Sequence, residues 1–135
     1  MGEVKKVYLT WDDVNRLLDL LYDQTKGKIN MVTGIPRGGS LLAVMFSHRF
    51  NIDYTRWPSN HYPSMLIIDD IADSGNTIAA WEEDYNVPKY GTLHYKESSI
   101  VKPDFYAKTI DDDYGWIVYP WEQRNAKTIQ NYLEN

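Results

Sequence analysis

The sequence contains no cysteine and no long apolar run. Without cysteine there are no disulfides, thiolate nucleophiles or cysteine-ligated metals, which fits the reducing cytoplasm, where we expect the protein to work. No apolar run approaches the roughly 20 residues of a membrane helix. The polar start, Met1 to Lys6, lacks the apolar part of a signal peptide. We therefore expect no membrane partner.

Basic residues are too few for a general nucleic-acid binder. The 14 Lys and Arg are outnumbered by 19 Asp and Glu, giving a net charge of −5, whereas such proteins need a basic face to neutralise phosphates. A local basic pocket for a small phosphorylated ligand is compatible with this charge. The length, with 43% hydrophobic and 24% charged residues, predicts a single globular domain over residues 1–135.

Aromatic residues, in contrast, are abundant, with 5 Trp and 11 Tyr. Most of them should lie in the core or in a subunit interface, while one or two could stack on a planar ligand. We expect a homo-oligomer, either a dimer or a tetramer, because exposed Trp and Tyr suit such interfaces.

Helical and strand patterns alternate along the chain. Thr10 and Asp13 form a capping-box pattern, apolar residues at helical spacing run to Tyr22, and Gly27 follows as a stop. Further helical patterns cover 41–48, 78–85 and, after a cap at Asn125, 126–133, and apolar runs predict strands at 29–33, 64–68, 92–95, 105–110 and 116–119. This alternation indicates an α/β fold with a mainly parallel central sheet flanked by helices. Ligands then bind beyond the carboxyl ends of the strands.

The loop from Asp69 to Thr77 lies at such a strand end. Gly75 lets the backbone turn tightly, and the amides of the turn and of the next helix can point at a phosphate, with the Ser74 hydroxyl beside them. Asp69 and Asp70 would repel phosphate and instead suit sugar hydroxyls or a Mg²⁺ that bridges to phosphate. Composition alone allows an equally good interpretation, a polar turn that caps the next helix.

The order of residues in this loop distinguishes the two interpretations. From Met65 onward the sequence has four apolar residues, two acids, two apolar residues and then Asp73-Ser74-Gly75-Asn76-Thr77. This order closely resembles the signature of the type I phosphoribosyltransferases, which bind phosphoribosyl pyrophosphate (PRPP). The resemblance implies that family's fold, with a small C-terminal hood, and a 5′-phosphate held by residues 73–77. It also implies Mg²⁺ as cofactor, Asp69 and Asp70 facing the ribose, and Asp73 as general base.

A second glycine-rich turn, residues 34–39, lies between an earlier strand and helix. Such a turn alone is weak evidence. Here Arg37 precedes Gly38 and Gly39, and a guanidinium flanked by free amides suits a diphosphate. The turn resembles the pyrophosphate loop of purine phosphoribosyltransferases, which implies this role for all three residues. It also implies a non-proline cis peptide bond between Pro36 and Arg37.

The aromatic segment from Trp116 to Glu122 reads, by composition, as a core edge strand. Its order resembles the end of bacterial xanthine–guanine phosphoribosyltransferases, where Trp-Ile precedes Pro-Trp and an acid. The resemblance implies that Trp116 stacks on a purine and that the backbone at Ile117 reads the base edge. It further implies that Lys96, which would otherwise be read as a solvated lysine, donates to the 6-oxo group.

The pattern departs from these bacterial enzymes between Arg37 and Asp69. The interval is short, so residues 53–63 replace the flexible loop that closes over the reaction centre. Side chains that could form a minimal lid there, or an ordinary surface loop, are Arg56, Trp57, Asn60 and His61. Val118 also stands where an acid is common, which leaves the preferred base open.

The resemblance predicts purine salvage: transfer of the phosphoribosyl group of PRPP to xanthine, guanine or hypoxanthine, with release of pyrophosphate and formation of a nucleoside 5′-monophosphate. PRPP and a purine base are then the partners. Two alternatives stay open. The short lid favours a PRPP-binding regulator without catalysis. Transfer to another base, such as adenine or a pyrimidine, is opposed by Lys96, because a cation repels the donors of an exocyclic amine.

Overall fold

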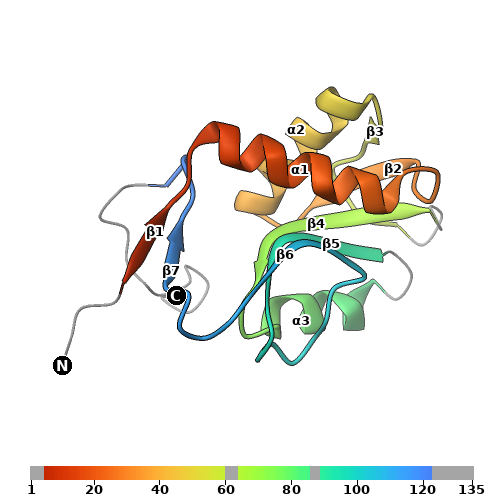
Figure 1. Cartoon of the computed structure of the whole chain (residues 1–135). Coiled ribbons are helices and arrows are strands. Elements are labelled where there is room, and N and C mark those ends of the chain that lie inside the picture. The colour runs from red at the N-terminus through yellow and green to blue at the C-terminus, as the bar shows by residue number, and fades with distance from the viewer. Residues whose placement is uncertain (1–4, 60–63, 86–88, 123–135) are drawn as a thin grey trace.

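The main sheet of the computed structural model, which describes residues 5–59, 64–85 and 89–122, has five strands in the order β3-β2-β4-β5-β6 (Figure 1). The strands are β2 (Met31–Gly34), β3 (Asp53–Tyr54), β4 (Met65–Ala72), β5 (Lys89–Lys96) and β6 (Phe105–Ile110). Every neighbouring pair is parallel. The predicted α/β fold with a mainly parallel sheet is therefore confirmed.

Helices cover both faces of this sheet. Helices α1 (Trp11–Thr25) and α2 (Gly38–Phe50) lie on one face, and α3 (Asn76–Asp84) lies on the other (Figure 1). Leu66 and Ile68 of β4 enter the core under α1 and α2, whereas Met65 and Ile67 enter a smaller core with Ile78 of α3. Burial on both faces explains why this strand reads as a continuous apolar run. No helix of the described part of the chain is long and apolar enough to cross a bilayer.

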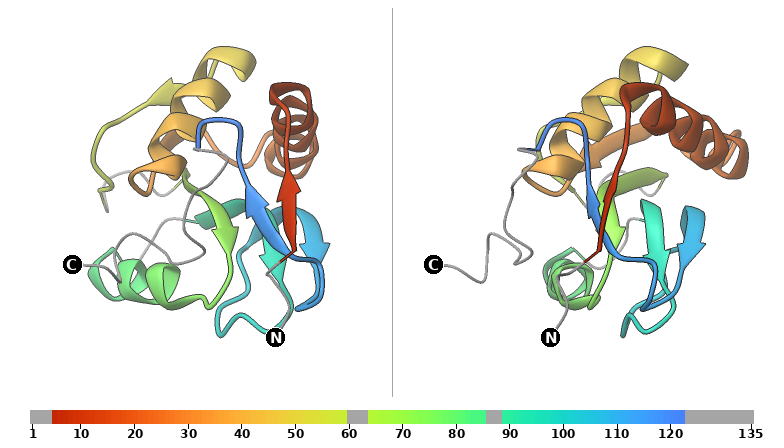
Figure 2. Two further views of the ribbon diagram at one scale, coloured as in Figure 1. Left: turned by 90° about the vertical axis from the view of Figure 1, so that its left-hand side faces the viewer. Right: turned by 60° about the vertical axis from the view of Figure 1, so that its left-hand side comes forward.

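A separate two-stranded hood lies beside the main sheet. It consists of β1 (Lys6–Tyr8) and β7 (Trp116–Val118), which pair in parallel (Figure 2). The sequence predicts β7 but not β1. Three residues with no buried position among them carry no strand pattern of their own, so β1 is defined by its distant partner.

Two other expectations about the strands need correction. β4 was expected to end at Ile68, but it continues to Ala72 and keeps its pairing with β5 beyond the two acids. Ile71 packs on the larger core and Ala72 lies in the smaller one, which holds this extension in the sheet. Asp69 and Asp70 are therefore strand residues.

The expected lid is in part a strand. Its first two residues form the edge strand β3, which pairs with β2. Arg56 and Trp57 follow, with the guanidinium 5.4 Å from the ring centroid. Asn60, His61 and the expected last helix after Asn125 lie outside the described residues.

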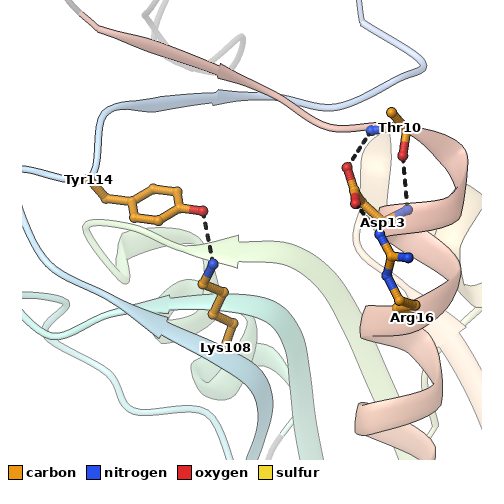
Figure 3. Close-up of polar contacts among 5 residues, drawn as sticks. All are labelled: Thr10, Asp13, Arg16, Lys108 and Tyr114. Atoms are coloured by element: carbon orange, nitrogen blue, oxygen red, sulfur yellow. Dashed lines mark hydrogen bonds and ion pairs between the residues drawn. The ribbon is translucent and has the colours of Figure 1, made fainter.

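The capping box predicted at the start of α1 is confirmed (Figure 3). The Asp13 amide donates to Thr10 Oγ1 at 3.1 Å, and the Thr10 amide donates to Asp13 Oδ2 at 2.9 Å. Arg16 pairs with the same carboxylate at 2.6 Å. Because α1 begins directly after β1, this cap also fixes the point where the chain leaves the hood.

Thr10→Ala should lower the free energy of unfolding by about 1 kcal/mol, because it removes the side-chain acceptor of the Asp13 amide. Urea denaturation followed by circular dichroism measures the change. Thr10→Ser keeps a hydroxyl and is the matched control, with stability close to that of the wild type. An equal loss in both variants would contradict a capping role for this hydroxyl.

Candidate active site

The turn from Asp73 to Gly75 joins β4 to α3. Gly75 has a φ of +88°, and a Cβ there would lie 2.5 Å from Ser99 Oγ, so only glycine fits this close approach. The Ile100 amide donates to the Ser74 carbonyl at 2.9 Å, which holds the turn against the loop after β5. The N-cap residue of α3, Gly75, has no side chain to cap the helix, and the Asn76 amide donates to the Ser74 hydroxyl at 3.2 Å. Among the described residues no partner is seen for the Thr77 amide of the same turn, which is therefore available to an anion.

The loop that carries Arg37 lies directly against the end of β4. The Ile35 amide donates to the carbonyl of Ile68 at 2.9 Å. A Cβ on Gly38 would lie 2.6 Å from Asp70 Oδ2, and one on Gly39 would overlap the Ile68 carbonyl. The peptide bond before Arg37 is cis, as predicted, and the Arg37 side chain is exposed. The backbone of this loop thus lies next to the acidic end of β4, and the same loop carries the exposed Arg37.

The two acids of β4 use one oxygen each to hold the local backbone. Asp69 Oδ1 accepts from the Asp70 amide at 2.9 Å, and Asp70 Oδ1 accepts from the Ile71 amide at 2.8 Å. The second oxygen of each carboxylate takes no part in these bonds. Burial raises the pKa of Asp70 to about 6. It also raises the pKa of Asp69 well above its usual range, with the charge of Asp70 adding to the shift.

Asp73 and Lys96 meet across the ends of two neighbouring strands. Asp73 follows the last residue of β4, and Lys96 ends β5, with Ala72 paired to Tyr95 between them. Lys96 Nζ lies 3.1 Å from Asp73 Oδ1. The structure thus brings together an acid and a lysine that the resemblance assigns to the same purine.

The hood carries the two residues expected to bind the base. Trp116 is partly buried and Ile117 is buried, and both lie in β7. The hood is attached to β4 through Tyr119, whose hydroxyl donates to the carbonyl of Asp70 at 3.1 Å. Trp121 stacks on Tyr119 at a ring distance of 4.9 Å and lies 3.5 Å from the place of a Cβ on Gly38. The segment that follows β7 therefore contacts both the Arg37 loop and β4.

Sequence reasoning did not assign Tyr119, Trp121 or His94 to the site. His94 is buried in β5, and its Nδ1 lies 2.9 Å from the Tyr119 hydroxyl. Burial lowers the pKa of His94 to about 4, with the charge of Lys108 adding to the shift. The available signal was a histidine within an apolar strand, because a buried imidazole needs a hydrogen-bond partner.

Asp70→Asn should raise the free energy of unfolding near pH 7 and leave it almost unchanged near pH 4. The folded-state pKa of Asp70 lies above the unfolded value, so the native state binds more protons, and stability is lost as the pH rises from about 4 through about 6. Asparagine removes this loss, which we expect to be about 1–2 kcal/mol near pH 7 after allowance for solvent screening. Urea denaturation at both pH values measures it.

The control for Asp70→Asn is Asp53→Asn, which changes an exposed carboxyl of β3. It should show no gain that depends on pH. Equal stabilisation by Asp70→Asn at both pH values would contradict a raised pKa at Asp70.

Comparisons with known proteins agree with this geometry. No protein-family model matches the chain. The xanthine-guanine phosphoribosyltransferase of Cereibacter sphaeroides (strain ATCC 17025 / ATH 2.4.3) is 25% identical over 147 residues, covering 87% of this chain and 87% of the relative. The crystal structure of the purine phosphoribosyltransferase from Pyrococcus horikoshii Ot3 is similar with a TM-score of 0.76 and 26% identity, covering 90% of this chain and 97% of that one.

A third similar protein, the Helicobacter pylori xanthine-guanine-hypoxanthine phosphoribosyltransferase, has a TM-score of 0.70 at 19% identity, over 88% of this chain and 93% of that one. At this identity the likeness concerns the fold. The predicted resemblance is confirmed: the chain has the type I phosphoribosyltransferase fold, and in sequence it is similar to the xanthine–guanine phosphoribosyltransferases.

Proposed function

We propose that this chain transfers the phosphoribosyl group of PRPP to a 6-oxopurine base (xanthine, guanine or hypoxanthine), releasing pyrophosphate and forming a nucleoside 5′-monophosphate for purine salvage. The observation that carries the proposal is the meeting of three chain segments at the carboxyl ends of β2, β4 and β5. There the Arg37 loop lies against Asp70, and Asp73 pairs with Lys96. The named activities of the relatives support the same reaction.

PRPP fits these segments by charge. Its 5′-phosphate would accept hydrogen bonds from the amides at the start of α3 and from the hydroxyls of residues 73–77. Asp69 and Asp70 would accept from the ribose hydroxyls with their second oxygens. Arg37 and the amides of Gly38 and Gly39 would neutralise the pyrophosphate.

We infer that Mg²⁺ binds with PRPP. Among the residues that the structure describes, no group of three or more His, Cys, Asp or Glu side chains could enclose a metal ion. Two adjacent carboxylates still fit Mg²⁺, which commonly takes one or two carboxylates and completes its shell with water and substrate phosphates. Asp69 and Asp70 would hold it. When bound, it would supply positive charge beside the leaving pyrophosphate.

The base would occupy the space between the hood and the Asp73–Lys96 pair. Trp116 would stack on the purine, and the backbone at Ile117 would read its edge. Lys96 would leave Asp73 to donate to the 6-oxo group, and the released carboxylate of Asp73 would accept the proton of the purine ring. A ring nitrogen then bonds to C1 of PRPP as the bond to pyrophosphate breaks, with Arg37 balancing the charge on the leaving group.

A PRPP-binding regulator without catalysis is the second candidate. The observation in its favour is that Asp53 and Tyr54, where the lid was expected to begin, pair with β2 as an edge strand. A shortened lid would exclude water poorly from the reaction centre.

The purified protein, mixed with PRPP and Mg²⁺, should form nucleotide from at least one of xanthine, guanine and hypoxanthine, and none from adenine or pyrimidines. Chromatography of the products measures this. Binding of PRPP by calorimetry without product from any base would support the regulator. No binding of PRPP would overturn both candidates.

Asp73→Asn should lower kcat by about 10²–10⁴-fold, because the general base is lost. The affinity for PRPP should stay within about twofold, because the amide keeps the size of the carboxylate and an acceptor for Lys96. Steady-state kinetics and calorimetry measure the two quantities. Asp84→Asn, at the far end of α3, is the control with unchanged turnover. Unchanged turnover in Asp73→Asn would remove this residue from the role of base.

A further inference from the structure

The hood is connected to the main sheet by a buried hydrogen-bonded chain. Tyr119 directly follows β7 and is 3% exposed. Its hydroxyl contacts the carbonyl of Asp70 at 3.1 Å and Nδ1 of His94 at 2.9 Å. His94 is 1% exposed and stands opposite Ile71 in the β4–β5 pair. Three segments that are distant in sequence therefore meet at one hydroxyl group.

The direction of each hydrogen bond in this chain is fixed by elementary chemistry. A carbonyl oxygen only accepts, so the single proton of the Tyr119 hydroxyl goes to Asp70. His94 must then carry a proton on Nδ1 and donate it to the Tyr119 oxygen. A tyrosine hydroxyl keeps its proton at neutral pH. Loss of any member leaves a buried polar group unpaired.

The hydrogen bonds from His94 through Tyr119 to Asp70 join the two halves of the proposed site. On one side is Asp70, whose carboxylate faces the Arg37 loop at Gly38. On the other side is the hood segment that holds Trp116 and Ile117. The stacked ring of Trp121 covers Tyr119 from the side of the loop.

The same hood segment is also held at its other end. Tyr114 precedes Trp116, and its hydroxyl accepts from Lys108 Nζ of β6 at 3.0 Å (Figure 3). Its ring centroid lies 6.5 Å from that of His94. Tyrosines on both sides of the expected base-binding residues thus lie against the β5–β6 part of the sheet.

We propose that Tyr119 and His94 are positioning residues, which set the place of the hood relative to β4 and thereby the fit of the base. The proposal rests on the proposed function, because it assumes that the hood holds the base. Neither side chain needs to touch a substrate. Their effect should be confined to ligands that reach the hood, and should spare ligands that occupy only the phosphate and ribose sites.

Calorimetry with two probe ligands distinguishes an effect on binding at the hood from an effect on the whole site. Guanosine, inosine or xanthosine 5′-monophosphate, whichever the wild type binds best, spans both halves of the site, whereas ribose 5-phosphate reaches only the half formed by β4 and α3. Tyr119→Phe removes the hydroxyl and keeps the ring. This variant should lower the affinity for the nucleotide about tenfold, as expected for one lost buried hydrogen bond. Its affinity for ribose 5-phosphate should fall by less than about twofold.

His94 is tested by a matched pair of variants of similar size. His94→Asn places an amide N–H near the position of Nδ1 and should bind the nucleotide within about threefold of the wild type, whereas His94→Leu removes the donor and should match Tyr119→Phe. Tyr22→Phe changes a tyrosine that stacks on Phe50 in the α1–α2 core, and should bind both probes as the wild type does. In kinetics, Tyr119→Phe should raise KM for the base more than it lowers kcat.

Three results would overturn the positioning role. The first is unchanged nucleotide affinity in Tyr119→Phe, and the second is equal weakening of both probes, which would indicate general damage. The third is equal impairment by His94→Asn and His94→Leu. A wild type that binds ribose 5-phosphate but no purine nucleotide would instead overturn the base site of the proposed function, and with it this proposal. A wild type that binds neither probe would overturn the PRPP site as well.

Discussion

The partial burial of two adjacent carboxylates near the end of β4 is the constraint on which the site depends. Ile71 and Ala72 pack into the two cores beyond the acids, so the strand cannot end before Asp69, and both carboxyls stay partly enclosed. Their raised pKa values show that this costs stability at neutral pH. A bound cation or sugar hydroxyl would offset that cost, because each compensates a carboxylate. The strand end is therefore less stable alone than it would be with a ligand, as expected of a binding site.

The parallel topology brings the remaining groups to these acids. Because β2, β4 and β5 are neighbours that run the same way, the Arg37 loop, Asp73 and Lys96 lie at one edge of the sheet. The Asp73–Lys96 ion pair is partly exposed, with 22% of the Asp73 side chain and 28% of the Lys96 side chain open to solvent. Ion pairs near the surface contribute little to stability. Exchange of this contact for a purine would consequently cost little, while the ion pair keeps both side chains near the site proposed for the base.

Local patterns in the sequence predict much of this arrangement. The capping box of α1, the apolar run of β4 and the two glycine-containing loops each depend on neighbouring residues, and the structure has all of them. The features that the sequence did not predict depend on residues far apart in the chain. β1 is a strand because β7 lies beside it, β4 continues because β5 and two cores hold it, and Tyr119 finds His94 and Asp70 across the fold. No spacing rule relates these residues.

The buried chain from His94 through Tyr119 to Asp70 also bears on the choice between enzyme and regulator. A protein that only bound PRPP would need the strand end, the Arg37 loop and the start of α3, all of which lie outside the hood. Burying a histidine and a tyrosine is unfavourable unless every polar group is paired, so a simple apolar contact would attach an idle hood equally well. The directional attachment beside Trp116 and Ile117 restricts where the hood can sit. Such restriction is useful when a second ligand, the base, must meet PRPP in a defined geometry.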